Sequence, residues 1–191
     1  MTPVLQFAQW LQYTDWAAAL RYSAQAYPVV LTLHLVGIAF FGGLIVFTDL
    51  RLLGLTMRRL PVSRVIDSLR LPKQIGFLIV VGCGVSLASA KAEEYYYNKF
   101  FWAKMSLLAL IAVHGLVFGR SVYRGRHEPE PSQAKLAGAL SLLLWTGVMI
   151  CGRGIGYIEP PLDKIHAQIH FVQDAALAAL RQPSQLKGQD H

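Results

Sequence analysis

Two histidines inside apolar stretches carry the clearest chemistry of this sequence. His34 lies in the run PVVLTLHLVGIAFFGGLIVFTDL, and His114 lies in the run at about residues 100–120. An ionisable side chain is costly inside a membrane and is therefore a functional candidate by default. Neutral imidazole is a standard axial ligand of haem iron. The pair suggests a haem b held by one imidazole from each of two helices, or a site that serves a quinone.

The depths of the two histidines argue against their sharing one iron. His34 follows Pro28 by six residues, which places it about 9 Å below the outer edge of a helix that rises 1.5 Å per residue. The same rise places His114 about 15–21 Å deep. Helix tilt reduces the difference of about 6–12 Å only in part. The alternative for each histidine is a hydrogen bond to the backbone or a side chain of a neighbouring helix.

Three charged residues at the ends of the apolar runs are interpreted as structural anchors. Asp49 lies near a helix C-terminus, where a carboxylate opposes the macrodipole, so we expect a cationic partner in Arg51 or Arg120. Arg153 could neutralise Glu159, or the headgroup of a lipid or quinone. We expect no acidic or basic side chain at mid-depth, which speaks against a pump or an ion-coupled transporter.

A second pair of histidines, His166 and His170, has the i, i+4 spacing that can hold a metal ion. Gln173 and Asp174 offer at best one weak further ligand. The alternatives are that one of these histidines completes a shallow site with His34, or that both lie on a solvated helix face.

The composition places the chain in a lipid environment. Hydrophobic residues make up 54% of the 191 residues and charged residues 15%, with a mean hydropathy of +0.39. Soluble domains are about 25% charged, so an ordinary cytosolic enzyme is excluded, as are a disordered chain and a disulfide scaffold. The net charge of +7 comes from basic residues that flank apolar runs. This distribution is typical of a membrane protein and indicates no nucleic-acid partner.

Four apolar runs approach the length of about 20 residues that a bilayer requires. They lie at about 28–50, 74–90, 100–120 and 136–152. The sequence therefore predicts an all-α fold, an integral four-helix bundle over residues 28–152. Amphipathic interfacial segments are expected at 1–27 and in the tail 153–191, with a helix at about 162–181. Small residues spaced four apart, Ala39 with Gly43, Gly84 with Ala88 and Gly115 with Gly119, are expected to let the helices approach closely.

The distribution of basic residues predicts the orientation. The loops that follow the first and third runs carry ten of the 18 Lys and Arg residues: Arg51, Arg58, Arg59, Arg64, Arg70, Lys73, Arg120, Arg124, Arg126 and Lys135. We therefore place these loops in the cytoplasm and both termini on the outer side of a bacterial inner membrane. The N-terminus does not have the pattern of a signal peptide. Both cysteines, Cys83 and Cys151, lie in apolar runs and are expected to be free thiols.

Several short motifs resemble an uncharacterised bacterial family of small four-span membrane proteins, a domain of unknown function. They are P-V-V-L-T-L-H-L-V-G at 28–37, T-D-L-R-L-L-G at 48–54, Gly76-Phe77, Asn98-Lys99-Phe100 with Lys104, and G-R-x-x-x-Y at 152–157. In similar sequences an acidic residue precedes the histidine of the first span, whereas this chain has Leu31 and Thr32 there. The resemblance implies the four-span architecture and no particular activity.

The sequence thus predicts a small membrane redox protein that relays electrons within the bilayer, with His34 and His114 as cofactor ligands. The alternatives are an accessory or scaffold subunit of a larger membrane complex, and a module that binds lipid or a small molecule. A homo-oligomer is compatible with each of these functions.

Overall fold

The structure, a computed structural model, describes residues 2–123, 129–158 and 160. Residues Met1–Ile158 form one compact unit, and its described part contains helices and no strand. Four helices are long and apolar enough to cross a membrane: α3 (Ala26–Leu52), α4 (Val62–Ala90), α6 (Lys99–Val117) and α7 (Pro131–Tyr157). The predicted all-α membrane bundle is confirmed at this level.

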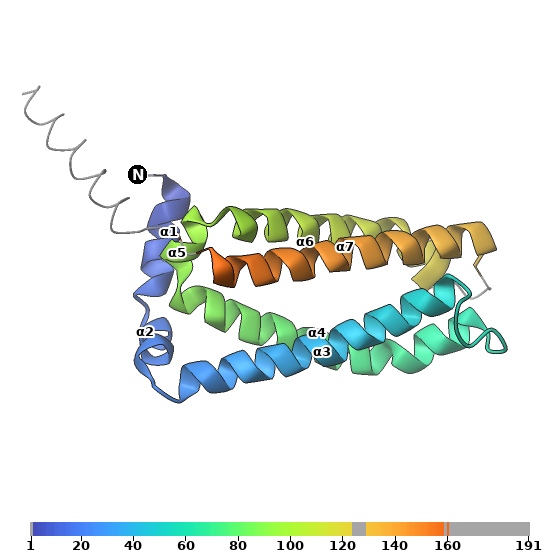
Figure 1. Ribbon diagram of the computed structural model, residues 1–191, viewed down its shortest axis with the longest axis horizontal. Coiled ribbons are helices and arrows are strands. Elements are labelled where there is room, and N and C mark those ends of the chain that lie inside the picture. The colour runs from blue at the N-terminus through green and yellow to red at the C-terminus, as the bar shows by residue number, and fades with distance from the viewer. Residues whose placement is uncertain (1, 124–128, 159, 161–191) are drawn as a thin grey trace, which may run out of the picture. The chain divides into compact units, whose positions relative to one another are not determined.

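The four long helices pack as two hairpins (Figure 1). Helix α3 packs against α4, α6 packs against α7, and contacts between α3 and α7 join the two pairs. Large apolar side chains cover the outside, with Leu78, Leu116 and Leu143 exposed by 69%, 80% and 70%. So large an apolar surface is stable in contact with lipid and not with water.

Three short helices lie at the end of the bundle where α3 and α6 begin (Figure 1): α1 (Pro3–Gln12), α2 (Asp15–Tyr22) and α5 (Ala92–Tyr97). Helix α1 packs on α5 with polar contacts at Glu93. Gln9 donates to the Glu93 carboxylate over 3.0 Å, and the Gln12 side chain accepts from the Glu93 backbone N–H over 2.9 Å. The segment predicted as one interfacial helix is therefore two helices, divided at Tyr13 and Thr14.

Polar caps fix where the long helices begin and end. The Asn98 side chain accepts from the backbone N–H of Phe100 over 2.9 Å, and its amide donates to the Ile158 carbonyl over 2.8 Å. This residue therefore ties the start of α6 to the end of α7. At the other end of the bundle Gly54 adopts φ 76°, and the bonds from Gly54 to Arg51 and from Leu55 to Leu50 close a Schellman motif that ends α3.

The predicted spans are correct in number and imprecise in extent. Helix α4 begins at Val62, twelve residues before the predicted start at Gln74, because Val62, Val65 and Ile66 bury an apolar face there. The third predicted span continues past α6 as a π-helical turn, η1 (Gly119–Tyr123). Hydropathy detects only the part of a helix that lies in lipid. Backbone hydrogen bonds continue the helix beyond this part into the polar region. The helix predicted at 162–181 lies outside the described residues.

Only part of the small-residue prediction matches contacts within the chain. A Cβ added to Gly84 would contact His34, but one added to Gly43, Gly115 or Gly119 would meet nothing within 4 Å. The close contact between α3 and α7 is at Gly138 instead, where an added Cβ would lie 2.9 Å from the Asp49 carbonyl oxygen. Free thiols are confirmed for both cysteines.

Candidate functional site

The His34 imidazole faces α4 and has an unused hydrogen-bonding atom. A Cβ added to Gly84 of α4 would lie 3.1 Å from the His34 Cε1, so the ring occupies the space that a side chain there would fill. The Nδ1 atom of His34 is buried and has no hydrogen-bond partner among the described residues. Buried polar atoms are nearly always paired in folded proteins, so an unpaired ring nitrogen indicates a partner outside the described residues.

On the other hairpin one side chain acts on His34, and a second lies near that side chain. Lys104 of α6 is partly buried and is close enough for its positive charge to act on the His34 ring. Cys151 of α7 lies near Lys104. Together His34, Gly84, Lys104 and Cys151 form what we call the outer layer, to which each of the four long helices contributes one residue. Sequence analysis did not identify Lys104 as a site residue.

His114 belongs to a different part of the bundle. Its Nε2 lies 3.1 Å from the Ala137 carbonyl oxygen of α7, and the residue is 8% exposed. Because a carbonyl oxygen only accepts, Nε2 must carry the proton and donate. The ring also contacts Phe118 and Tyr123, with centroid distances of 5.0 and 6.0 Å. His114 thus makes the interhelical hydrogen bond that we gave as the alternative to ligation, and it faces α7 whereas His34 faces α4.

An aromatic layer lies one to two turns further along α3 from His34. Phe41 of α3 contacts Trp145 of α7 edge-on at 5.4 Å and Phe77 of α4 at 5.9 Å between ring centroids. Such tilted pairs are favourable arrangements of aromatic rings. This layer fills the interior of the bundle between His34 and Asp49 and links the two hairpins.

A second polar cluster, the inner layer, lies beyond the aromatic rings. It consists of Thr48, Asp49, Lys73, Tyr123 and Ser141. Asp49 is 2% exposed, and its Oδ2 has no hydrogen-bond partner among the described residues. Lys73 donates to the Thr48 hydroxyl over 3.2 Å, and its charge acts on Asp49. The Ser141 hydroxyl is within hydrogen-bonding reach of both Asp49 and Tyr123.

The π-helical turn η1 brings Tyr123 into this layer. Burial raises the pKa of Tyr123 above its ordinary value, the negative charge of Asp49 raises it further, and the hydrogen bond with Ser141 opposes both effects. The phenol therefore stays protonated and can donate. Single π-helical turns are frequent at functional sites because they redirect side chains that a regular helix would place elsewhere.

The expected cationic partner of Asp49 requires a correction. Arg51 donates instead to the Leu60 carbonyl, with its Nε at 3.1 Å, and Arg120 is exposed. The cation near Asp49 is Lys73, which sequence analysis placed in a loop because α4 begins earlier than its apolar run. Both charged side chains lie at the end of the bundle where α3 ends, so the prediction that no charged side chain lies at mid-depth stays a prediction. A usable signal was Gly76, one turn after Lys73, since Gly76 packs on Phe41 and marks the face of α4 that meets α3.

The remaining predicted site residues lie away from these layers. The Arg153 guanidinium is exposed and binds Tyr157 of the same helix, with 3.1 Å to its hydroxyl and 4.8 Å to its ring centroid. His166 and His170 lie outside the described residues. Within residues 2–123, 129–158 and 160 no group of three or more His, Cys, Asp or Glu side chains could hold a metal ion.

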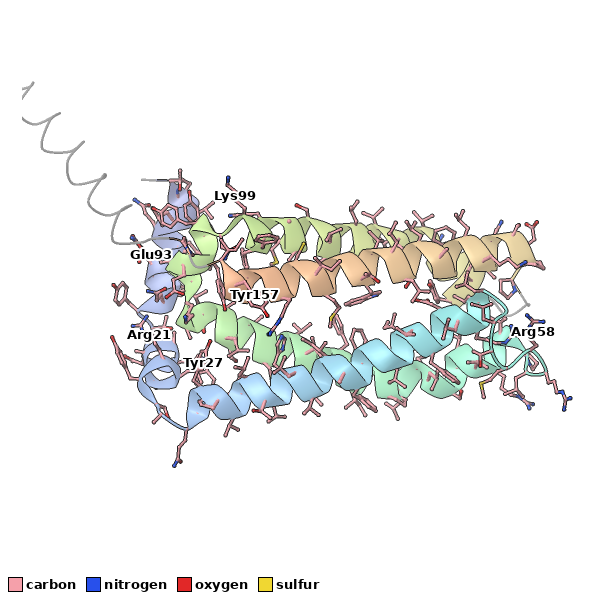
Figure 2. The ribbon with its side chains drawn as sticks, in the orientation of Figure 1. Arg21, Tyr27, Arg58, Glu93, Lys99 and Tyr157 are labelled. Atoms are coloured by element: carbon pink, nitrogen blue, oxygen red, sulfur yellow. The ribbon has the colours of Figure 1, made fainter. Side chains whose placement is uncertain are left out.

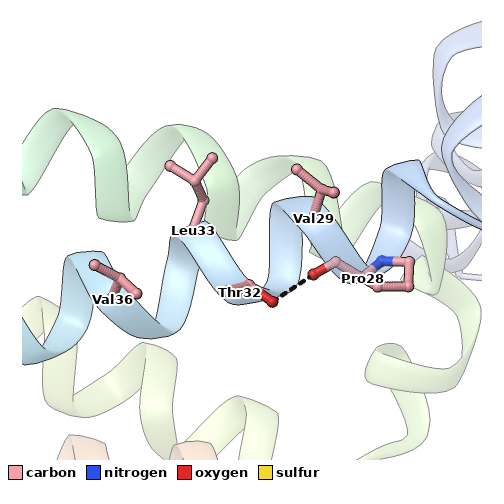
Figure 3. A pocket seen from close by; sticks show the side chains of 5 residues that line it. All are labelled: Pro28, Val29, Thr32, Leu33 and Val36. Carbon is pink, nitrogen blue, oxygen red and sulfur yellow. Dashed lines mark hydrogen bonds between the residues drawn. The ribbon is translucent and has the colours of Figure 1, made fainter.

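An open apolar groove of about 380 Å³ runs along the start of α3 (Figure 3). Its lining is Pro28, Val29, Thr32, Leu33 and Val36. The Thr32 hydroxyl donates to the Pro28 carbonyl over 2.8 Å, so the polar atom is satisfied within the helix. These residues lie on the side of α3 opposite His34 by helical spacing, and the groove therefore belongs to the lipid-facing surface.

Comparison with known proteins identifies a family without assigning an activity. Residues 13–158 match the family described as "Family of unknown function (DUF6644)", and the chain belongs to this family. No curated protein and no solved structure matches the chain. The match covers all four long helices together with α2, α5 and η1.

Proposed function

We propose that this member of the DUF6644 family is a small membrane redox protein that binds haem b in the outer layer, with His34 as an iron ligand. The observation that carries the proposal is the buried Nδ1 of His34, which has no partner among the described residues. Imidazole is a ligand that haem iron takes from proteins, and the described residues leave this ring with an unpaired nitrogen. Bound haem would supply one-electron transfer, and the protein would relay those electrons within the bilayer.

The residues around His34 have the character that a haem site needs. The absence of a side chain at Gly84 lets the ring pack against α4, and the aromatic layer of Phe41, Phe77 and Trp145 closes the interior on the inner side. An apolar enclosure would keep water from the iron and strengthen the electrostatic interaction of nearby charges with it. His114 has no place in this site, because its Nε2 donates to Ala137. We therefore propose His34 alone, and not the pair, as the essential histidine.

The test is an absorption spectrum of the purified protein before and after reduction with dithionite. We expect a Soret band with sharp α and β bands, which His34→Ala removes and His114→Ala retains. His114→Ala is the matched control, because it removes the same side chain from the other apolar helix. Bands that survive in His34→Ala, or their absence from wild-type protein reconstituted with haem, would contradict the haem site. If the protein is colourless but contains extractable quinone, the redox function stands and the cofactor is quinone instead of haem.

A second candidate function, an accessory subunit of a larger membrane complex, rests on glycines that face outward. A Cβ added to Gly42 or Gly43 of α3, or to Gly82 of α4, would meet nothing within 4 Å. In lipid, helices associate through small residues that let backbones approach. If this face binds a partner subunit or a second copy, Gly43→Leu will release a stoichiometric partner that wild-type protein retains in mild detergent. If both wild-type protein and Gly43→Leu purify as monomers without a partner, this function is excluded.

A further inference from the structure

The loop that joins α3 to α4, residues 53–61, is held in a defined conformation by two arginines. Arg51 donates from its Nε to the Leu60 carbonyl over 3.1 Å, which ties the end of α3 to the end of the loop. Arg58 donates from its Nε to the Gly54 carbonyl, which closes the loop on itself. We call this segment the α3–α4 loop.

The α3–α4 loop exposes both apolar and cationic side chains. Leu55 and Met57 are exposed by 65% and 42%, and Arg58 and Arg59 are exposed as well. Met57 has φ 49°, a conformation that a residue other than glycine keeps only where the surrounding contacts hold it. The apolar side chains are therefore exposed by a loop with fixed contacts.

The lengths of the two flanking helices indicate where this loop lies in a membrane. Helix α3 has 27 residues and α4 has 29, which correspond to about 40 Å and 44 Å at 1.5 Å per residue. The hydrocarbon core of a bilayer is about 30 Å thick, and the bilayer with its headgroups is about 40–45 Å thick. A loop that joins the ends of two such helices lies among the headgroups, from where apolar side chains can reach the acyl chains.

The positive charge around the loop is not neutralised within the described part of the chain. Residues 51–73 contain six basic residues and one acidic residue, Asp67. No Asp or Glu among the described residues lies within salt-bridge distance of Arg58 or Arg59. A guanidinium carries five N–H donors that match the oxygens of a phosphate group. Arg58 uses one of them on the Gly54 carbonyl, so both arginines have donors for an anion.

We propose that the α3–α4 loop binds an anionic phospholipid. Arg58 and Arg59 bind the headgroup phosphate, while the side chains of Leu55 and Met57 contact the acyl chains. A zwitterionic lipid fits less well because its own cation offsets the phosphate, and a soluble phosphate would leave the two apolar side chains in water. This surface lies at the end of α3, does not involve His34, and goes beyond the redox function.

The test titrates delipidated protein in a neutral detergent with phosphatidylglycerol or phosphatidylcholine, and native mass spectrometry counts the bound lipid. We expect wild-type protein to prefer phosphatidylglycerol by about 25-fold, or about fivefold for each arginine. Arg58→Gln with Arg59→Gln should remove this preference and leave phosphatidylcholine binding unchanged. Arg58→Lys with Arg59→Lys should keep most of it. Lys99→Gln is the control, because Lys99 is an exposed cation that Figure 2 shows at the opposite end of the bundle from Arg58.

Unchanged binding of phosphatidylcholine shows that the double glutamine variant is folded. If this variant keeps the wild-type preference for phosphatidylglycerol, the loop is not the site and the proposal fails. Should the variant not fold, Arg58→Gln and Arg59→Gln alone decide, since each should lose about fivefold and an unchanged preference in both contradicts the proposal. Inorganic phosphate separates the two sources of the anion. Displacement of phosphatidylglycerol by millimolar phosphate would assign the loop to a soluble phosphate and overturn the lipid site.

Discussion

Asp49 and Lys73 illustrate how single charged residues are accommodated inside this bundle. Asp49 is the only large side chain among the described residues that the protein encloses completely, and the ammonium of Lys73 is the cation that acts on it. The two make no direct salt bridge, because Lys73 donates to Thr48. A buried charge that loses its compensating partner costs more than the interaction between the two contributes.

We therefore expect Lys73→Met to lower the free energy of unfolding by about 1–3 kcal/mol, because it leaves Asp49 uncompensated. The double variant Lys73→Met with Asp49→Asn should recover most of this loss. Unfolding in mixed detergent micelles measures both variants, with Arg70→Met, an exposed residue of the same helix, as the control. Equal losses for Lys73→Met and Arg70→Met would show that Lys73 does not compensate Asp49.

For single residues, the sequence shows which polar side chains lie in apolar runs more reliably than it shows which residues they contact. His34 and His114 are conspicuous because a polar group in an apolar run is visible without a structure. Lys104 and Lys73 are not, since a lysine near the end of a run reads as an anchor at the membrane surface. Whether such a side chain points inward depends on the face that its helix presents to the next one. For Lys73 that face is the one on which Gly76, one turn later, packs against Phe41.

The helices are positioned by a few close backbone contacts. Gly138 of α7 approaches α3 so closely that an added Cβ would lie 2.9 Å from the Asp49 carbonyl oxygen and 3.0 Å from the Leu52 Cβ. Neither atom can move without displacing the α3 backbone. On the same helix, an added Cβ on Gly152 would meet nothing within 4 Å.

Gly138→Ala should therefore destabilise the protein by about 1–3 kcal/mol, the usual cost of overpacking. Gly152→Ala should stabilise it by about 0.5–1 kcal/mol, because alanine favours a helix over glycine. The difference in thermal midpoint between these two variants isolates the contact between α3 and α7. If both substitutions raise the midpoint, the two hairpins do not meet at Gly138.

The number of long helices followed from hydropathy, but their ends and the short helices did not. Runs of about 20 apolar residues need no tertiary information, because lipid itself selects them. The early start of α4 and the separate α5 depend on contacts instead. Val62 and Ile66 bury against the other hairpin at one end, and Glu93 accepts from Gln9 at the other. These contacts join residues far apart in the chain, which local patterns do not report.

Helix α5 also makes the stability of the outer end depend on pH. Burial raises the pKa of Tyr95 to about 12, and the negative charges of Tyr27 and Glu94 add to the effect. The folded protein therefore binds this proton more tightly than the unfolded chain. The resulting stability is complete below pH 10, the ordinary value, and is lost as pH rises through about 12.

Tyr95→Phe should accordingly reduce the fall in thermal midpoint between pH 10 and 12. The measurement is a series of thermal unfolding curves across this interval, recorded for wild-type protein, Tyr95→Phe and Tyr13→Phe. Tyr13 is 70% exposed and provides the control. An unchanged slope in Tyr95→Phe would show that another group causes the alkaline loss.

The two ends of the bundle differ in the kinds of side chain that they carry. The described part of the end with α1, α2 and α5 carries aromatic side chains and charges of both signs, and the opposite end carries the arginine-rich loop between α3 and α4. Figure 2 shows Glu93 and Lys99 at the first end and Arg58 at the other. The excess of basic residues predicts that the Arg58 end lies on the cytoplasmic side, since positively charged loops are retained there.

Thiol labelling tests this orientation in a chain that carries Cys83→Ala and Cys151→Ala. A membrane-impermeant maleimide should label Lys99→Cys in intact bacterial cells and should label Arg58→Cys only after the membrane is permeabilised. Both positions are exposed in the structure, so lack of reaction reflects the membrane and not burial. Labelling of Arg58→Cys in intact cells would show that the topology is the inverse of the one predicted. The outer layer with His34 would then lie in the cytoplasmic half of the membrane, and its electron donor or acceptor would have to be sought on that side.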